Sequence, residues 1–149
     1  MGPHVADLRI STDDYEPDGP MPERLSKDGG NEVPAFSVTG VPEDAVELAL
    51  VVHDPDAPMV RGFTHWVVYG LPAQDGPIDP SVGRAAPTTA GEPGWYGPQP
   101  PAGHGTHRYY AWVYALSAPV SGEPTREAFL DRDGGSILEQ ARVVGTFSR

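Results

Sequence analysis

The sequence contains no cysteine among its 149 residues. This absence excludes a disulfide framework, a thiolate metal site and a thiol nucleophile. Basic residues are also scarce: 10 Lys and Arg stand against 21 Asp and Glu, which gives a formal net charge of -11 at pH 7. A charge of this sign repels nucleic acids and anionic membrane surfaces at long range, so we expect neither as a partner.

Long hydrophobic runs are missing as well. No stretch approaches the length of a membrane span, and residues 1–11 include Asp7 and Arg9 and have no apolar signal-peptide core. We therefore expect a cytoplasmic protein without stable membrane insertion. The length fits a single domain that spans residues 1–149.

Strand patterns dominate the chain. The candidate strands are rich in β-branched and aromatic residues and are bounded by Gly or Pro. They cover 46–52, 64–71 and 109–116, with shorter ones at 5–10, 36–38 and 144–148. Helix signals are confined to 125–131 and to a capping box that begins at Ser136 and includes Glu139. This pattern predicts a mainly β fold, an antiparallel β-sandwich with short C-terminal helices.

One long segment, 87–106, is too rich in Gly and Pro for a regular element, since ten of its twenty residues are of these two types. Composition alone is compatible with a flexible surface loop. Trp95 and Tyr96 favour an ordered loop instead, because they offer large apolar surfaces that can pack against the domain.

Two compound motifs stand out. The first, at 53–58, reads His-Asp-Pro-Asp-Ala-Pro and is followed by His65 and Trp66; the second, at 97–109, contains Pro-Pro and ends in His-Arg-Tyr. Together they resemble the phosphatidylethanolamine-binding protein family, in which such blocks meet around one small anion pocket. The resemblance covers roughly residues 5–149 and implies the family's β-sandwich. The short link between Pro58 and His65 is similar to the compact bacterial branch, often described as Raf kinase inhibitor-like.

The resemblance implies which side chains line the pocket. They are Asp54, His65, Pro100, Pro101, His107 and Tyr109. Asp56 and Arg108 match signature positions with a structural role. The resemblance also implies a cis peptide bond between Ala57 and Pro58.

The chemistry of these residues suits a bound oxyanion. A carboxylate would repel such a ligand directly, so we expect Asp54 to orient a histidine and favour its imidazolium, which offers two donors. His107 and Tyr109 are two residues apart and share one face if the strand has begun at His107. Along the strand 64–71, the same alternation places His65 with Val67, Tyr69 and Leu71. Backbone N–H groups of 103–106 could complete an anion nest.

Two function classes follow. The first is a regulatory or scaffold protein that binds a small anionic or phosphorylated ligand without a cofactor. The second is an enzyme in which Asp54, His65 and His107 are catalytic, for proton transfer, cyclisation or isomerisation of a small metabolite. A module that only binds protein is a third alternative, and the oligomeric state, with a homodimer as one option, stays open.

A metal site is disfavoured. His53, His65, His104 and His107, with Asp54 and Asp56, could supply ligands, but no independent ligand motif supports this. Two residues depart from the family pattern. Val38 stands where many relatives have Trp, and Phe147 stands where many bacterial relatives have Tyr.

Overall fold

The structure, a computed structural model, describes residues 6–149 and contains two antiparallel sheets. The large sheet has the strand order β6-β4-β3-β7-β8 and the small sheet the order β1-β2-β5. The strands are β1 (Arg9–Thr12), β2 (Phe36–Thr39), β3 (Glu47–Asp54), β4 (Phe63–Leu71), β5 (Gly76–Pro77), β6 (Arg84–Ala85), β7 (His107–Leu116) and β8 (Ile137–Phe147). The helical segments are α1 (Arg126–Asp133) and the 3-10 turns η1 (Glu23–Leu25), η2 (Pro80–Val82) and η3 (Gly134–Ser136).

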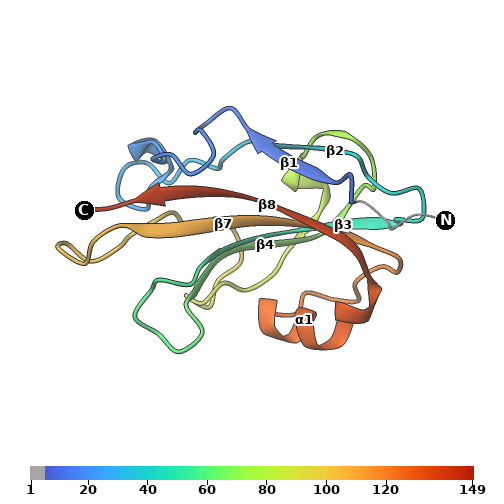
Figure 1. Ribbon diagram of the computed structural model, residues 1–149. Coiled ribbons are helices and arrows are strands. Elements are labelled where there is room, and N and C mark those ends of the chain that lie inside the picture. The colour runs from blue at the N-terminus through green and yellow to red at the C-terminus, as the bar shows by residue number, and fades with distance from the viewer. Residues whose placement is uncertain (1–5) are drawn as a thin grey trace.

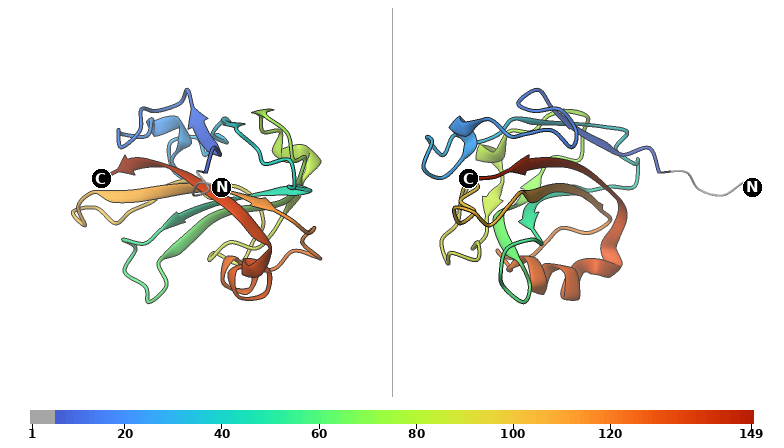
Figure 2. Two further views of the ribbon diagram at one scale, coloured as in Figure 1. Left: turned by 45° about the vertical axis from the view of Figure 1, so that its right-hand side comes forward. Right: turned by 60° about the vertical axis from the view of Figure 1, so that its left-hand side comes forward.

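The large sheet is covered on both faces. Figure 1 shows β1 and β2 on one side of it and α1 on the other, and the two views of Figure 2 keep this order of layers. All eight residues of the central strand β3 are buried, as expected for a strand with cover on both faces. The predicted β-sandwich is therefore confirmed.

Side chains of β3 alternate between two apolar clusters. Leu48, Leu50 and Val52 belong to the cluster between the two sheets, whereas Ala49 and Val51 belong to the cluster beneath α1. This alternation carries through to Asp54, the last residue of the strand, which follows Val52 by two positions. A polar group thus lies at the end of an apolar row that faces the small sheet.

The helix predicted at 125–131 is present as α1. Thr125 caps it, because its Oγ1 accepts a hydrogen bond from the backbone N–H of Ala128 at 3.3 Å. Phe129 is fully buried and its ring packs on Tyr69 and Tyr114, at centroid distances of 5.2 and 5.5 Å. These contacts, more than the weak apolar pattern of α1 itself, hold the helix on the sheet.

The second predicted helix, from Ser136, is wrong. The chain enters β8 at Ile137 and pairs antiparallel with β7 along almost its whole length. Glu139 does not cap a helix; its buried Oε1 accepts the backbone N–H groups of Asp7 and Leu8 at 3.0 and 3.1 Å. Ten cross-strand pairs outweigh the local capping signal.

The N-terminal strand is shorter than expected. The prediction covered 5–10, whereas β1 begins at Arg9 and pairs with β2 from Arg9 opposite Thr39 to Thr12 opposite Phe36. Val5, the first residue of that prediction, lies outside the described residues.

The loop 87–106 is held by specific contacts. Trp95 is buried against Trp66, and its Nε1 donates to the carbonyl of Leu25 at 3.1 Å. Asn31 brackets the same stretch, since its Nδ2 donates to the Trp95 carbonyl and its Oδ1 accepts the N–H of Gly97. A Cβ on Gly97 would lie 2.2 Å from the Leu25 carbonyl oxygen, so only glycine allows this close approach. These contacts place the following segment beside β7.

Candidate functional site

A cavity of about 190 Å³ opens where β3 ends and where β4 and β7 begin. It brings together all six residues that the sequence predicts for the ligand pocket. They are Asp54, His65, Pro100, Pro101, His107 and Tyr109. The remaining wall comes from residues that sequence reasoning did not assign to the site, among them Met59, Phe63 and Tyr96. The six positions thus converge from three strands and one loop.

Asp54 and His107 form a buried pair. Each side chain belongs to a residue that is only 2% exposed, and His107 Nδ1 lies 2.6 Å from Asp54 Oδ2. A carboxylate oxygen accepts, so Nδ1 carries the proton and donates it. Burial raises the pKa of Asp54, and the hydrogen bonds from His107 and from the Asp56 N–H oppose that shift. The expectation that Asp54 orients a histidine matches this geometry.

The rest of the first motif shapes the turn after β3. Asp54 Oδ1 accepts the N–H of Asp56 at 2.7 Å, and Asp56 Oδ2 accepts the N–H of Arg108 at 2.8 Å. Asp56 therefore ties this turn to the start of β7, and its role is structural, as the resemblance implied. Residues 6–149 contain no cis peptide bond, so the expectation for Ala57 and Pro58 is wrong in this structure.

His65 reaches the cavity through an irregularity in β4. Thr64 pairs with His53 and Trp66 pairs with Val52, so His65 is an extra residue between them. Such a bulge re-aims a side chain. The ring of His65 packs against Tyr109 on the side of the small sheet, at a centroid distance of 5.1 Å.

The face predicted for His65 is therefore wrong in part. Regular alternation put it with Val67 and Tyr69, but these two residues belong to the cluster beneath α1. A second register shift returns Leu71 to the cluster between the sheets.

His65 is a neutral acceptor in this site. Its Nδ1 donates to the carbonyl oxygen of Tyr96 at 2.5 Å, while its Nε2 is buried and has no hydrogen-bond partner. Burial lowers the pKa of His65 to about 4. The ring therefore carries one proton, on Nδ1, and presents a lone pair on Nε2 at neutral pH. The expectation that imidazolium supplies the donors does not apply to this histidine.

Aromatic rings complete the wall. His107 and Tyr109 share one face of β7, as predicted, with ring centroids 6.5 Å apart. The rings of Phe63 and Tyr96 pack around His65, with centroid distances of 4.6 and 6.1 Å from its ring. Burial, with the nearby charge of Asp54, raises the pKa of Tyr109. Its phenol is therefore protonated and can donate.

The nest predicted at 103–106 does not form. The N–H of Gly103 donates to the Arg149 carbonyl at 3.3 Å, and the N–H of His104 donates to the Pro101 carbonyl at 3.1 Å. None of these four loop residues is among those that line the cavity. His104 instead contacts His107, with 2.6 Å between His104 Nδ1 and His107 Nε2. Sequence reasoning considered His104 only as a metal ligand and missed this contact.

Other candidate residues lie away from the cavity. His53 points to the opposite face of β3, where its Nδ1 contacts Thr64 Oγ1 at 3.0 Å and burial lowers its pKa to about 4. Val38 and Phe147, the two departures from the family pattern, are buried between the sheets and do not line the cavity.

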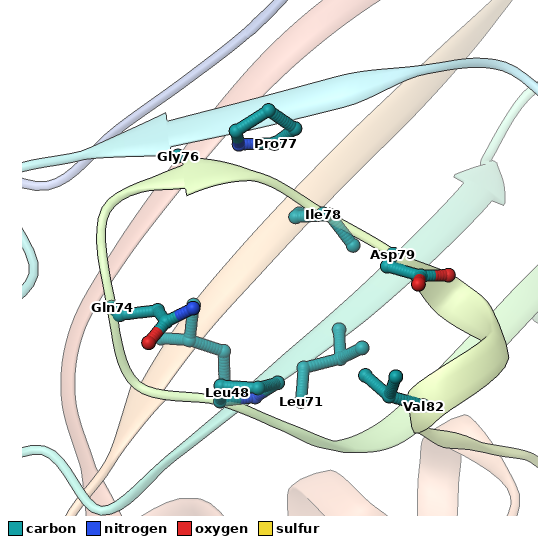
Figure 3. A pocket seen from close by; sticks show the side chains of 9 residues that line it. Leu48, Leu71, Gln74, Gly76, Pro77, Ile78, Asp79 and Val82 are labelled. Atoms are coloured by element: carbon teal, nitrogen blue, oxygen red, sulfur yellow. The ribbon is translucent and has the colours of Figure 1, made fainter.

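A second cavity, of about 250 Å³, lies at the other end of β3 and β4. Figure 3 shows Leu71, Ile78 and Val82 around it, with Leu48 on its floor and Asp79 at its edge. The Asp79 carboxylate caps η2, because its Oδ1 accepts from the N–H and the Oγ of Ser81. The lining holds no second titratable side chain. The histidine cavity is therefore the candidate site.

Two features were not found in the described part of the chain, a metal-binding cluster and a membrane-spanning helix. Within residues 6–149, no group of three or more His, Asp or Glu side chains has an arrangement that could hold a metal. The same residues form no helix with the length and apolar character to cross a membrane.

Comparisons with known proteins identify the family to which the chain belongs. The model of the phosphatidylethanolamine-binding protein family matches residues 11–148. The chain belongs to this family. A UPF0098 protein of Methanothermobacter thermautotrophicus is 33% identical over 95% of this chain and 99% of its own length. The crystal structure of CT736 from Chlamydia trachomatis, described as a homologue of the family, superposes with a TM-score of 0.88 at 30% identity, over 97% of this chain and 99% of that one.

One relative bears on cellular location. LppC of Mycobacterium tuberculosis is 37% identical over 97% of this chain and 74% of its own length, and it carries a provisional lipoprotein name. The names of the other two relatives suggest no compartment. The cytoplasmic location expected for this chain stays a prediction, and the oligomeric state stays open.

Proposed function

We propose that this family member binds a small ligand with an oxyanion head group, such as a phosphate monoester, in the cavity at the ends of β3, β4 and β7. The observation that carries the proposal is the buried pair of Asp54 and His107, 2.6 Å apart, which lines a cavity that also contains an unpartnered His65 Nε2. Buried polar groups are nearly always satisfied, so this orphaned ring nitrogen is open to a hydrogen-bond donor from a ligand.

The lining suits an oxyanion that itself carries a hydrogen. His107, supported by Asp54, and the phenol of Tyr109 can donate to oxygen atoms. His65 Nε2 can only accept at neutral pH, so it favours a ligand with a hydroxyl, an ammonium or a protonated phosphate oxygen. Among the described residues that line the cavity there is no Lys or Arg. Binding therefore depends on the geometry of the hydrogen bonds that these side chains make.

A role as a regulatory or scaffold protein fits such a site. The proline walls at Pro100 and Pro101 give the cavity a fixed shape that selects a small head group without contributing N–H donors. Kinase inhibition does not follow, because it depends on surfaces outside the two motifs.

One observation supports an acid/base enzyme as a second candidate. Asp54, His107 and His104 form a continuous chain of 2.6 Å contacts from the buried carboxylate to an exposed imidazole. Such a chain can return a proton to solvent after a transfer in the cavity. A chromosomal setting among biosynthetic genes would favour this candidate over a binding protein.

Calorimetric titration with inorganic phosphate and with phosphoethanolamine tests the binding proposal. His107→Ala removes a charge-assisted donor, and we expect the affinity to fall about ten- to a hundredfold. The matched control is Val82→Ala at the second cavity, which should leave the affinity unchanged. A folded His107→Ala protein with the affinity of the unmodified chain would overturn the proposal.

A further inference from the structure

His104 is an exposed loop residue that contacts a buried member of the site. Its Nδ1 lies 2.6 Å from His107 Nε2, and the two ring centroids are 4.8 Å apart. The backbone at His104 is held by two hydrogen bonds, from the Gly103 N–H to the Arg149 carbonyl and from the His104 N–H to the Pro101 carbonyl. The backbone therefore positions the His104 ring for its contact with His107.

The hydrogen bonds of His107 are then complete. Nδ1 donates to Asp54, and Nε2 shares one proton with His104, whichever of the two rings carries it. No ring nitrogen of His107 is left to donate to a ligand. Yet His107 lines the cavity, and Nε2 is the only one of its nitrogens that Asp54 does not hold.

From this geometry we infer that His104 is a specificity-determining residue that occupies His107 Nε2 until an oxyanion replaces it. The inference rests on the proposed function, because the replacing group is the ligand's oxyanion. A ligand without a strong acceptor cannot displace an imidazole that already satisfies Nε2, whereas a phosphate oxygen forms the stronger, charge-assisted bond. His104 thus excludes neutral ligands from His107.

The charged and titratable groups around the pair do not offer a substitute. Asp54 faces His107 from β3, His65 and Tyr109 line the same cavity from β4 and β7, and Asp56 is engaged with Arg108. His104 is therefore the only described side chain besides Asp54 that holds a ring nitrogen of His107.

The affinity of His104→Ala for inorganic phosphate, measured by calorimetry on the full chain, tests this inference. We expect binding about three- to tenfold tighter than in the unmodified protein, since the ligand no longer displaces a hydrogen bond. His104→Asn keeps a hydrogen-bonding group near the position of Nδ1 and should bring the affinity back toward the original value. Thr106→Ala, an exposed change on the same loop, is the matched control and should change the affinity less than twofold.

A second readout does not depend on a variant. Long-range proton–nitrogen NMR spectra should show the His104 ring nitrogens shifting as phosphate saturates the unmodified protein, although His104 does not line the cavity. Equal or weaker binding by His104→Ala, with the unmodified chain binding phosphate, would overturn the inference and leave the proposed function standing. Binding by His104→Ala alone would support it. Absence of binding in both proteins would defeat the proposed function and this inference together.

Discussion

The two cavities lie at opposite ends of β3 and β4, on the side of the large sheet that faces the small one, and differ in what lines them. Leu48 and Asp54 lie on the same face of β3 and belong to the two different cavities. At the Leu48 end the lining is mostly aliphatic, and its one carboxylate, Asp79, is exposed and caps a turn. At the Asp54 end a carboxylate and two imidazoles are buried together. One sheet face thus supports two environments of opposite character.

The difference shows that the aliphatic end mainly stabilises the fold, whereas the Asp54 end holds polar groups that suit ligand binding. Burial of aliphatic surface stabilises a fold in rough proportion to area, whereas buried polar groups stabilise it little unless every one of them has a partner. At the Asp54 end, His65 Nε2 is a fully buried side-chain atom without a hydrogen-bond partner. This unpaired nitrogen costs the ligand-free fold some stability, and a ligand that donates a hydrogen bond to it recovers that free energy.

The largest effect is expected at the aliphatic end. Leu48 is 1% exposed, so Leu48→Ala should lower the free energy of unfolding by about 2–5 kcal/mol, as measured by urea denaturation. Phosphate affinity should stay within twofold, because the cavity that holds Asp54 is at the far end of β3. The control is Val82→Ala, which alters a half-exposed side chain and should cost under about 1 kcal/mol. A tenfold change of affinity in folded Leu48→Ala would show that the two ends are coupled.

An effect of comparable size is the acid sensitivity that buried histidines cause. The pKa values of His53 and His65 are lowered to about 4, whereas an unfolded histidine titrates near 6.5. Between these values the unfolded chain binds more protons, so stability falls as pH falls from about 6.5 toward 4. At pH 4.5 each histidine should cost roughly 2–3 kcal/mol relative to pH 7. The raised pKa of Asp54 acts in the opposite direction, because the folded protein holds this proton more tightly than the unfolded chain does.

Urea denaturation at pH 7 and pH 4.5 measures this loss. In His65→Asn, an amide nitrogen can replace Nδ1 as donor to the Tyr96 carbonyl but does not titrate, so about half of the acid-induced loss should disappear. An acid-induced loss of the same size in His65→Asn would mean that His65 is already charged in the folded protein.

The strands and the cavity residues could be predicted from the sequence, but for different reasons. The strands 47–54, 63–71 and 107–116 were visible because their β-branched and aromatic residues match the local preference for extended structure. The six cavity residues were found because two compound motifs carry them, not because strand periodicity places them. Motif and periodicity agree for His107 and Tyr109 and disagree for His65, where only a bulge reconciles them.

Tertiary contacts account for what the sequence did not predict. Glu139 reads locally as part of a helix cap, but in the fold its carboxylate anchors the backbone of Asp7 and Leu8, more than 130 positions away. His104 has no local signal that distinguishes an exposed loop histidine from one that closes a hydrogen bond to a buried ring. Both depend on segments that meet only after the sheets have formed.

The smallest of these effects, and the most direct comparison of the two ends, comes from Asp54→Asn and Asp79→Asn. Each change removes one negative charge, so each alters the long-range field alike. Asp54 uses both oxygens, Oδ1 for the Asp56 N–H and Oδ2 for His107 Nδ1. An amide offers one oxygen and one NH₂ group, so one of these two donors would face another donor.

Asp79 accepts both bonds from Ser81 on a single oxygen, which an asparagine can reproduce. We therefore expect Asp54→Asn to weaken phosphate binding about tenfold and Asp79→Asn to change it less than twofold, by calorimetry at one pH and salt concentration. If both variants weakened phosphate binding equally, the loss of affinity would be due to the change in net charge. Tighter binding by Asp54→Asn would mean that the carboxylate repels the ligand more than it supports His107, because only then does removing its charge outweigh the loss of its hydrogen bond to the ring.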